Sequence, residues 1–253
     1  MQRPRAIAHE VKLKVWNARD AVRGYRYATR LAAPKGVAAR AEPPEKRRLE
    51  LYFDANTEGP GVWKWRHYFD VYERHFAKFI GRQVHVVEVG IFSGGSLPMW
   101  REYFGEQCQI YGVDIEPACR VYEQAGISVF IGDQSDPAFW KTFCQRVPVV
   151  DVLIDDGGHE PRQQIATLKG ILPHIRPGGV YICEDIHGAF HPFHSFIDGL
   201  CRPLNETNTE PTPFQQHVRS VHRYPFATVI EKPELPVARF ESLRHGTEWQ
   251  PFL

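Results

Sequence analysis

Five short runs rich in β-branched residues, each closed by an acidic residue or a glycine, constrain the fold of this chain more than any other feature. They are VHVVEVG (84–90), QIYGVD (109–114), VFIGD (129–133), VVDVLID (149–155) and VYICED (180–185). Runs of this length and composition are typical of buried strands. Segments with helical spacing separate them and begin near Ser96, Asp136 and Pro161, where Ser96 and Asp136 are suited to cap a helix. The alternation predicts a parallel sheet with helices on both faces.

The two ends of the chain depart from this alternation. HVRSVHRY (217–224) and FATVIE (226–231) predict an antiparallel pair at the sheet edge. A Pro-Gly-Gly turn at 177–179 is predicted after the helix that ends near Leu172. The fold class is therefore α/β, a doubly wound and mostly parallel seven-stranded sheet with a C-terminal antiparallel hairpin and N-terminal helices. Residues 63–79 have helical spacing, and residues 49–253 form the main domain.

Residues 1–48 form a basic segment with a different character. They carry thirteen lysines and arginines against four acidic residues, although the whole chain has a formal net charge of only +1. Apolar residues recur at helical steps between Ile7 and Leu31, which predicts an amphipathic helix followed by a linker. This helix is expected to pack on the main domain or on a second subunit, and contact with a membrane surface is the less favoured alternative.

Composition restricts the class of protein further. The near-balanced charge gives no field for a nucleic-acid partner, and no stretch approaches the roughly 20 apolar residues of a membrane span. The five cysteines are odd in number and show no zinc or redox spacing, which favours a reduced, cytoplasmic setting.

The strand ends indicate a nucleotide-like ligand, because ligands of open parallel sheets lie beyond the carboxyl ends of the strands. The first strand ends in Glu88 and Gly90 and leads into a glycine-rich turn before Ser96. An acid before this turn, without a G-x-G-x-x-G pattern, would repel a pyrophosphate and suits the cationic S-adenosylmethionine. A plain strand-to-helix connection is the alternative. Three further acceptors follow the next two strands: Asp114, Asp133 and Gln134.

A second cluster of acids and histidines closes the fourth and fifth strands. It comprises Asp155, Asp156, His159, Glu184, Asp185 and His187. Carboxylates this close repel one another unless a cation compensates them, and oxygen ligands favour Mg²⁺, with Mn²⁺ or Ca²⁺ as alternatives. The competing interpretation is that the aspartates cap the next helix and that the Glu-Asp pair binds Arg162 or Arg176. His187, His191 and His194 are spaced as a zinc site would be, but a substrate-lining loop is favoured.

Between His67 and Phe190 the sequence resembles class I S-adenosylmethionine-dependent methyltransferases, and within them the metal-dependent O-methyltransferases that act on macrolide sugars. The resemblance rests on YFDVYERHF, VVEVGIFSGGSLPMW, YGVDI, GDQSDPAF, VDVLIDDGGHEPRQQ and RPGGVYICEDIHGAF. It departs at Gly158, where these enzymes usually have serine, and in the short N-terminal part.

The resemblance implies a role for each residue that matches the motifs. The cofactor residues it implies are Glu88, Gly90, Ser96, Asp114, Asp133 and Asp155. The metal ligands it implies are Asp156, Glu184 and Asp185, and the general base is His159.

These observations lead to a hypothesis of metal-dependent methyl transfer from S-adenosylmethionine to a hydroxyl of a sugar or glycosylated natural product. The metal would lower the pKa of the acceptor hydroxyl and His159 would remove its proton. Aromatic residues expected to stack on the sugar are Trp63, Trp65, Phe190 and Phe193. A cephalosporin hydroxylase-like oxygenase that holds Fe(II) and a non-catalytic cofactor-binding protein remain alternatives. A homo-oligomer is also expected.

Overall fold

The computed structural model describes residues 18–31, 45–207 and 210–246. The chain divides into two compact units, Met1–Glu45 and Lys46–Leu253. Residues 18–28 of the first unit form a helix, in agreement with the second half of the predicted amphipathic helix; the first half and the predicted linker lie outside the described residues. Within the described part of the chain, no helix combines the length and apolar character needed to span a membrane.

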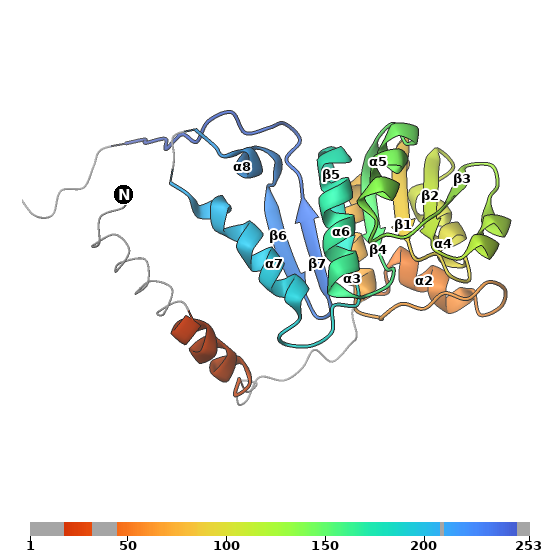
Figure 1. The fold of residues 1–253 in the computed structure, drawn as a ribbon, viewed down its shortest axis with the longest axis horizontal. Coiled ribbons are helices and arrows are strands. Elements are labelled where there is room, and N and C mark those ends of the chain that lie inside the picture. Colours follow the sequence, from red (N-terminus) through yellow and green to blue (C-terminus); the bar gives the residue numbers. More distant parts are fainter. Residues whose placement is uncertain (1–17, 32–44, 208–209, 247–253) are drawn as a thin grey trace, which may run out of the picture. The chain divides into compact units, whose positions relative to one another are not determined.

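The second unit contains a seven-stranded sheet in the order β3-β2-β1-β4-β5-β7-β6 (Figure 1). Its strands are β1 (Val84–Val89), β2 (Cys108–Asp114), β3 (Ile127–Ile131), β4 (Val150–Asp155), β5 (Ile175–Cys183), β6 (Ser220–Tyr224) and β7 (Ala227–Glu231). Strands β1 to β5 are parallel, whereas β7 runs antiparallel to both β5 and β6. The predicted fold class, including the antiparallel hairpin, is confirmed.

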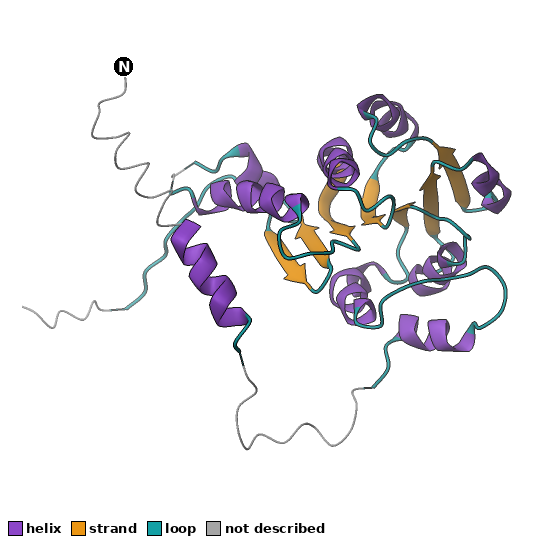
Figure 2. Ribbon diagram, turned by 60° about the horizontal axis from the view of Figure 1, so that its bottom comes forward, coloured by secondary structure: helices purple, strands orange, loops and turns teal. Residues whose placement is uncertain are grey.

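Helices cover both faces of this sheet, as Figure 2 shows. The helices are α2 (Arg48–Ala55), α3 (Tyr68–Phe76), α4 (Ser96–Phe104), α5 (Pro137–Arg146), α6 (Pro161–Ile171), α7 (Pro192–Cys201) and α8 (Pro213–His217). Side chains alternate across the pleat, so Val86 of β1 joins the core under α2, α3 and α4 while its neighbour Val87 joins the core under α5, α6 and α7. Burial of both faces explains why the strands are continuously apolar.

Strand β1 lies between β2 and β4, and this is where the strand order reverses. Val89 pairs with Asp155, and Asp155 pairs with Cys183 of β5. The register therefore brings the carboxyl ends of β1, β4 and β5 to one edge, where a doubly wound sheet binds its ligand.

Helix α3 is shorter than predicted, and its tyrosine side chains reach the carboxyl ends of the strands. The predicted helix over 63–79 begins only at Tyr68 and continues as a 3-10 turn at Ala77–Phe79, while residues 62–65 are an extended loop. Four buried aromatic residues of α3 pack on the sheet: Tyr68, Phe69, Tyr72 and Phe76. This packing directs the hydroxyls of Tyr68 and Tyr72 to the strand ends.

Three local predictions are wrong. Gly95, not Ser96, is the N-cap of α4, and the Ser96 hydroxyl donates to Glu88 instead. The Pro-Gly-Gly segment lies inside β5, where the β4–β5 pairing shifts from Val150 with Ile175 to Val152 with Val180 and the extra residues belong to β5. The first edge strand begins at Ser220, since residues 213–217 form α8. The Asp136 cap of α5 is confirmed by a bond from the backbone N–H of Ala138.

Candidate functional site

A cavity of about 760 Å³ opens at the carboxyl ends of the parallel strands. Its walls come from the β1–α4, β2, β3–α5, β4–α6 and β5 strand ends and from the loop before α3. The residues predicted from sequence that line it are Trp63, Trp65, Gly90, Ser96, Asp114, Asp133, Gln134, Asp156, His159, Glu184, Asp185 and His187. A second hollow of about 910 Å³ lies between α5 and α6 and contains none of the predicted site residues, so the first cavity is the candidate site.

The turn after β1 lies in close contact with the backbone of the β4 loop. Gly90 has φ +83°, and a Cβ there would collide with the carbonyl oxygen of Asp156. Phe92 also has a positive φ of 42°, and its N–H donates to Asp114 Oδ2 over 2.9 Å. The missing side chain at Gly90 therefore permits the β1 turn to touch the β4 loop, and Asp114 fixes the turn from β2.

Asp114, Asp133 and Gln134 all stabilise the loops of the cavity. The second oxygen of Asp114 accepts from the N–H of Glu116. Asp133 Oδ1 accepts from the N–H of Ser135, a bond that lowers the pKa of Asp133. The Gln134 amide donates to Asp155 and accepts from the N–H of Gly158. The Gln134 side chain thus connects two loops from inside.

Two of the predicted cofactor residues, Glu88 and Asp155, lie beneath the cavity and do not line it. Asp155 accepts from Gln134 and from the Tyr181 hydroxyl, and burial raises its pKa to about 7. Glu88 Oε2 accepts from Ser96 over 2.6 Å, whereas its Oε1 has no hydrogen-bond partner among the described residues. Burial also raises the pKa of Glu88.

Lys64 is the central residue that sequence reasoning missed. Its Nζ lies 2.6 Å from Asp156 Oδ2, 3.0 Å from Glu184 Oε2 and 3.6 Å from Glu88 Oε1, and its side chain is 2% exposed. Burial alone would lower the pKa of Lys64, but the three carboxylates outweigh burial and raise this pKa well above its ordinary value. A charged ammonium therefore stands among the acids that the sequence assigned to a dication.

The two acids that end β5 face different partners. Glu184 is fully buried and accepts from Tyr72 over 2.7 Å as well as from Lys64; burial raises its pKa, although Lys64 opposes the rise. Asp185 has φ +54° and accepts from Trp65 Nε1 and the Tyr68 hydroxyl. Both acids are thus oriented by the segment that carries Lys64 and α3.

Asp156, His159 and Asp185 come together at the open side of the cavity. One potential ligand atom from each lies within 4.8 Å of the others, and His159 Nε2 is 3.8 Å from Asp185 Oδ2. His159 has φ +53° and its side chain is 45% exposed. The strained backbone presents the imidazole to the cavity, where it is accessible to a ligand.

These positions test whether the acids fit a dication. Asp156 and Asp185 offer carboxylate oxygens to the open side of the cavity, as Mg²⁺ requires. Both oxygens of Glu184 are hydrogen-bonded, to Lys64 and Tyr72, and Asp156 Oδ2 accepts from the same Lys64, so a cation bound at either acid would compete with the Lys64 ammonium. The donor set therefore fits a hard cation bound by Asp156 and Asp185. Glu184 could become a further ligand if Lys64 moved away.

Of the alternative roles for the acids, the helix cap is wrong, whereas pairing with a basic residue is confirmed for Glu184, whose partner is Lys64 in place of Arg162 or Arg176. Glu160 is the N-cap of α6, and Arg176 pairs with Asp151. Neither Asp155 nor Asp156 caps α6, and the Glu-Asp pair binds the cation Lys64 and the donors of α3.

The remaining histidines and aromatic residues predicted to surround the substrate lie in different places. His187 lines the cavity, whereas His191 caps α7. Phe193 is wholly buried in the core under α7, so its expected place against a sugar is wrong. Trp63 and Phe190 are exposed, at 92% and 84%. Trp65 packs with His187 and Phe226 at the cavity rim, and these rings form its aromatic edge.

Comparison with known proteins gives a consistent result. Residues 87–186 match a family model described as a methyltransferase domain. The chain is 31% identical over 189 residues to the 8-demethyl-8-alpha-L-rhamnosyl tetracenomycin-C 2'-O-methyltransferase of Streptomyces olivaceus, covering 72% of this chain and 48% of the relative. It is 37% identical over 128 residues to the mycinamicin VI 2''-O-methyltransferase of Micromonospora griseorubida, covering 48% and 32%. The chain thus spans half the length of these curated relatives or less.

A solved structure agrees with the observed fold. A methyltransferase from the mycinamycin biosynthetic pathway, in complex with Mg, SAH and mycinamycin VI, superposes with a TM-score of 0.65 at 27% identity. The match covers 74% of this chain and 54% of that structure. Together, the sheet order, the glycine turn and these matches show that the chain carries a methyltransferase domain of the class I, S-adenosylmethionine-dependent family.

Proposed function

We propose that the protein is a metal-dependent O-methyltransferase that moves a methyl group from S-adenosylmethionine to a hydroxyl of a sugar or glycosylated natural product. One observation carries the proposal: the glycine turn after β1 and the Asp156, His159 and Asp185 group open into the same cavity. The names of the matched relatives support the reaction, and the Mg and SAH in the matched structure support the two cofactors.

The donor would lie over the Gly90 turn. Gly90, Asp114 and Asp133 line the same wall of the cavity. These acids suit the hydroxyls and positive charge of S-adenosylmethionine and disfavour a pyrophosphate. Glu88 acts from below, since its bond from Ser96 holds the start of α4 against the end of β1.

The acceptor hydroxyl would lie between His159 and the donor. The accessible His159 imidazole removes the hydroxyl proton, and Asp185, 3.8 Å from Nε2, stabilises the imidazolium that forms. The acceptor oxygen then bonds to the methyl carbon while the carbon–sulfur bond breaks. The electron pair of the broken bond stays on the sulfur and neutralises the sulfonium. Trp65 orients Asp185 through its indole N–H, and Tyr68 does so through its hydroxyl.

Asp156 and Asp185 would hold Mg²⁺ or Mn²⁺, and the predicted ligand Glu184 would take part only on displacement of Lys64. A dication bound there would lower the pKa of the acceptor hydroxyl and fix its orientation. Lys64 holds Asp156 and Glu184 in place before any cation arrives. The same pocket would thus be organised in the absence of metal.

The assay is methyl incorporation, read by mass spectrometry, across a panel of glycosides with S-adenosylmethionine and Mg²⁺. SAH should raise the melting temperature, and more so with Mg²⁺. His159→Gln should slow methyl transfer by roughly 10²- to 10⁴-fold while SAH affinity stays the same, because this exposed side chain supports neither fold nor turn. Full turnover by the His159→Gln variant would overturn the base assignment. No SAH binding at millimolar concentration would overturn the proposed function.

The oxygenase alternative is not favoured by the geometry. The group at the cavity has one histidine and two carboxylates, whereas non-haem Fe(II) oxygenases use two histidines and one carboxylate. A parallel assay with Fe(II) and O₂ separates the two reactions. The retained His159 and both carboxylates likewise favour an enzyme over a non-catalytic binding protein.

The cellular location, the acceptor class and the oligomeric state are also part of the proposal. We infer a cytoplasmic enzyme with a small-molecule glycoside acceptor and no nucleic-acid partner, since all five cysteines are free and the matched relatives are named for glycosylated small molecules. Homo-oligomerisation is proposed on the exposed aromatic residues near the cavity, such as Trp63. Light scattering tests it directly.

A further inference from the structure

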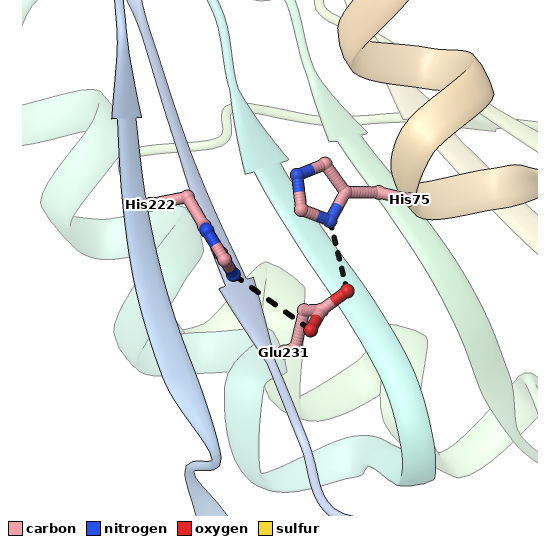
Figure 3. Close-up of side chains that lie close together, drawn as sticks. All are labelled: His75, His222 and Glu231. Carbon is pink, nitrogen blue, oxygen red and sulfur yellow. Dashed lines mark hydrogen bonds and ion pairs between the residues drawn. The ribbon is translucent and has the colours of Figure 1, made fainter.

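A second group of potential metal ligands lies at the edge of the sheet, apart from the cavity. His75 of α3, His222 of β6 and Glu231 of β7 each offer one ligand atom, and the three atoms lie within 4.8 Å of one another. Figure 3 shows the two imidazoles converging on the Glu231 carboxylate from α3 and from the hairpin. The residues are up to 156 positions apart in sequence, so only the tertiary fold brings them together.

We propose that His75, His222 and Glu231 form a transition-metal site, suited to Zn²⁺, that links α3 to the β6–β7 hairpin. Two imidazoles and one carboxylate are a donor set that zinc accepts, and the nitrogen ligands disfavour Mg²⁺. The oxygen-rich group at the cavity has the opposite preference. The two sites would therefore bind different metals.

One separation between potential ligand atoms in the cluster is shorter, and one is longer, than the separation expected between ligand atoms of a tetrahedral zinc site. Zinc bonds of about 2.0–2.2 Å place neighbouring ligand atoms roughly 3.3 Å apart. His75 Nδ1 lies 2.8 Å from Glu231 Oε1, and His222 Nε2 lies 3.7 Å from Glu231 Oε2. Small side-chain shifts would admit an ion between them. His222 is 35% exposed, so the ion would enter from the β6 side.

The surroundings orient these ligands as the outer partners of metal sites do. In the structure the Nδ1–H of His75 donates to Glu231 Oε1 and Nε2 accepts from the Tyr224 hydroxyl over 2.8 Å. A metal at Nδ1 would require the other tautomer, in which the Nε2–H donates to the Tyr224 oxygen. Ser220 Oγ lies 3.0 Å from His222 Nε2 and 3.2 Å from Glu231 Oε2, and it offers a fourth oxygen.

Cations nearby oppose an incoming ion and give the proposal a second test. Arg219 donates to Glu231 Oε2 over 2.9 Å, and Lys78 is close enough to help lower the pKa of Glu231. A bound dication would have to displace Arg219, whose side chain is 56% exposed. Removal of this guanidinium should therefore tighten metal binding.

The experiment is a titration of the metal-stripped full chain with Co²⁺, read by visible absorption, and with Zn²⁺, read by calorimetry. Asp185→Asn is the background, because it removes a ligand of the cavity group and keeps an oxygen that accepts from Trp65 and Tyr68. We expect one equivalent of Co²⁺ with tetrahedral absorption bands. His222→Gln should weaken binding by roughly 100-fold or more, beyond the loss typical of outer partners.

Two variants serve as controls. His217→Gln removes an exposed histidine at the end of α8 and should leave the titration unchanged. Arg219→Gln should tighten binding. Absence of the tetrahedral bands, or equal Zn²⁺ affinity in the His222→Gln and His217→Gln variants with intact circular dichroism, would show that the cluster is only a hydrogen-bonded link between α3 and the hairpin.

Discussion

Replacement of Lys64 by methionine tests the electrostatic account of the site most directly. The substitution keeps much of the side-chain volume but leaves Asp156, Glu184 and Glu88 without their shared cation. At the observed separations of 2.6, 3.0 and 3.6 Å, each pair contributes about 4 to 6 kcal/mol at an effective dielectric of about 20. The cost of burying the charges offsets most of this attraction.

The net effect is the cost of leaving buried carboxylates unpaired. We expect Lys64→Met to lower the free energy of unfolding by about 3–5 kcal/mol at pH 7.5, which corresponds to a fall in melting temperature of roughly 6 to 20 °C. Urea unfolding, followed by tryptophan fluorescence in a buffer with chelator, measures it. Lys46→Met is the matched control, because Lys46 also lies 2.6 Å from an acid, Asp54, but is 52% exposed. That variant should lose less than about 1 kcal/mol.

The loss of stability in the Lys64→Met variant should depend on pH in a defined direction. Burial already raises the pKa values of Glu88 and Glu184, and a protonated carboxyl needs no counter-cation. The deficit of the Lys64→Met variant should therefore shrink as pH falls from 8 toward 5, and Mg²⁺ should restore part of it at pH 7.5. A deficit no larger than that of Lys46→Met at pH 7.5 would refute the reasoning.

Two further predictions concern residues below and beside the cavity. Gly90→Ala should weaken SAH binding at least tenfold in calorimetry. It should also destabilise the fold more than the control Gly59→Ala, because both glycines have positive φ but only Gly90 faces a backbone carbonyl. Gly59→Ala should lower the free energy of unfolding by about 1–2 kcal/mol, and an equal loss in the two variants would contradict the close-contact argument. For Asp155, a folded pKa of about 7 against an ordinary 3.8 means that its cost to stability is absent below about pH 4 and grows up to about pH 7. Asp155→Asn should therefore be most destabilising below about pH 4, less so at about pH 5 and least above about pH 7 in urea unfolding, and a pH-independent difference would exclude this assignment.

The sequence alone determined the sheet and much of the cavity wall. Period and composition identified the parallel strands, since strands buried on both faces must be continuously apolar. Strand polarity then placed the terminal acids at one edge, because parallel strands end on the same side. Gly90 and His159 were found by the same reasoning, as both follow directly from a strand end.

Only the tertiary structure decided which acids face the cavity and which cation they meet. Asp155 and Asp156 are adjacent in sequence, yet the last residue of β4 faces Gln134 and Tyr181 under the cavity, whereas the next residue leaves the strand and faces Lys64. Lys64 stands 92 residues before Asp156 and 120 before Glu184, in a short loop without periodicity. A long-range ion pair leaves no local pattern, because its energy depends on a separation that only the packing of α3 on the sheet creates.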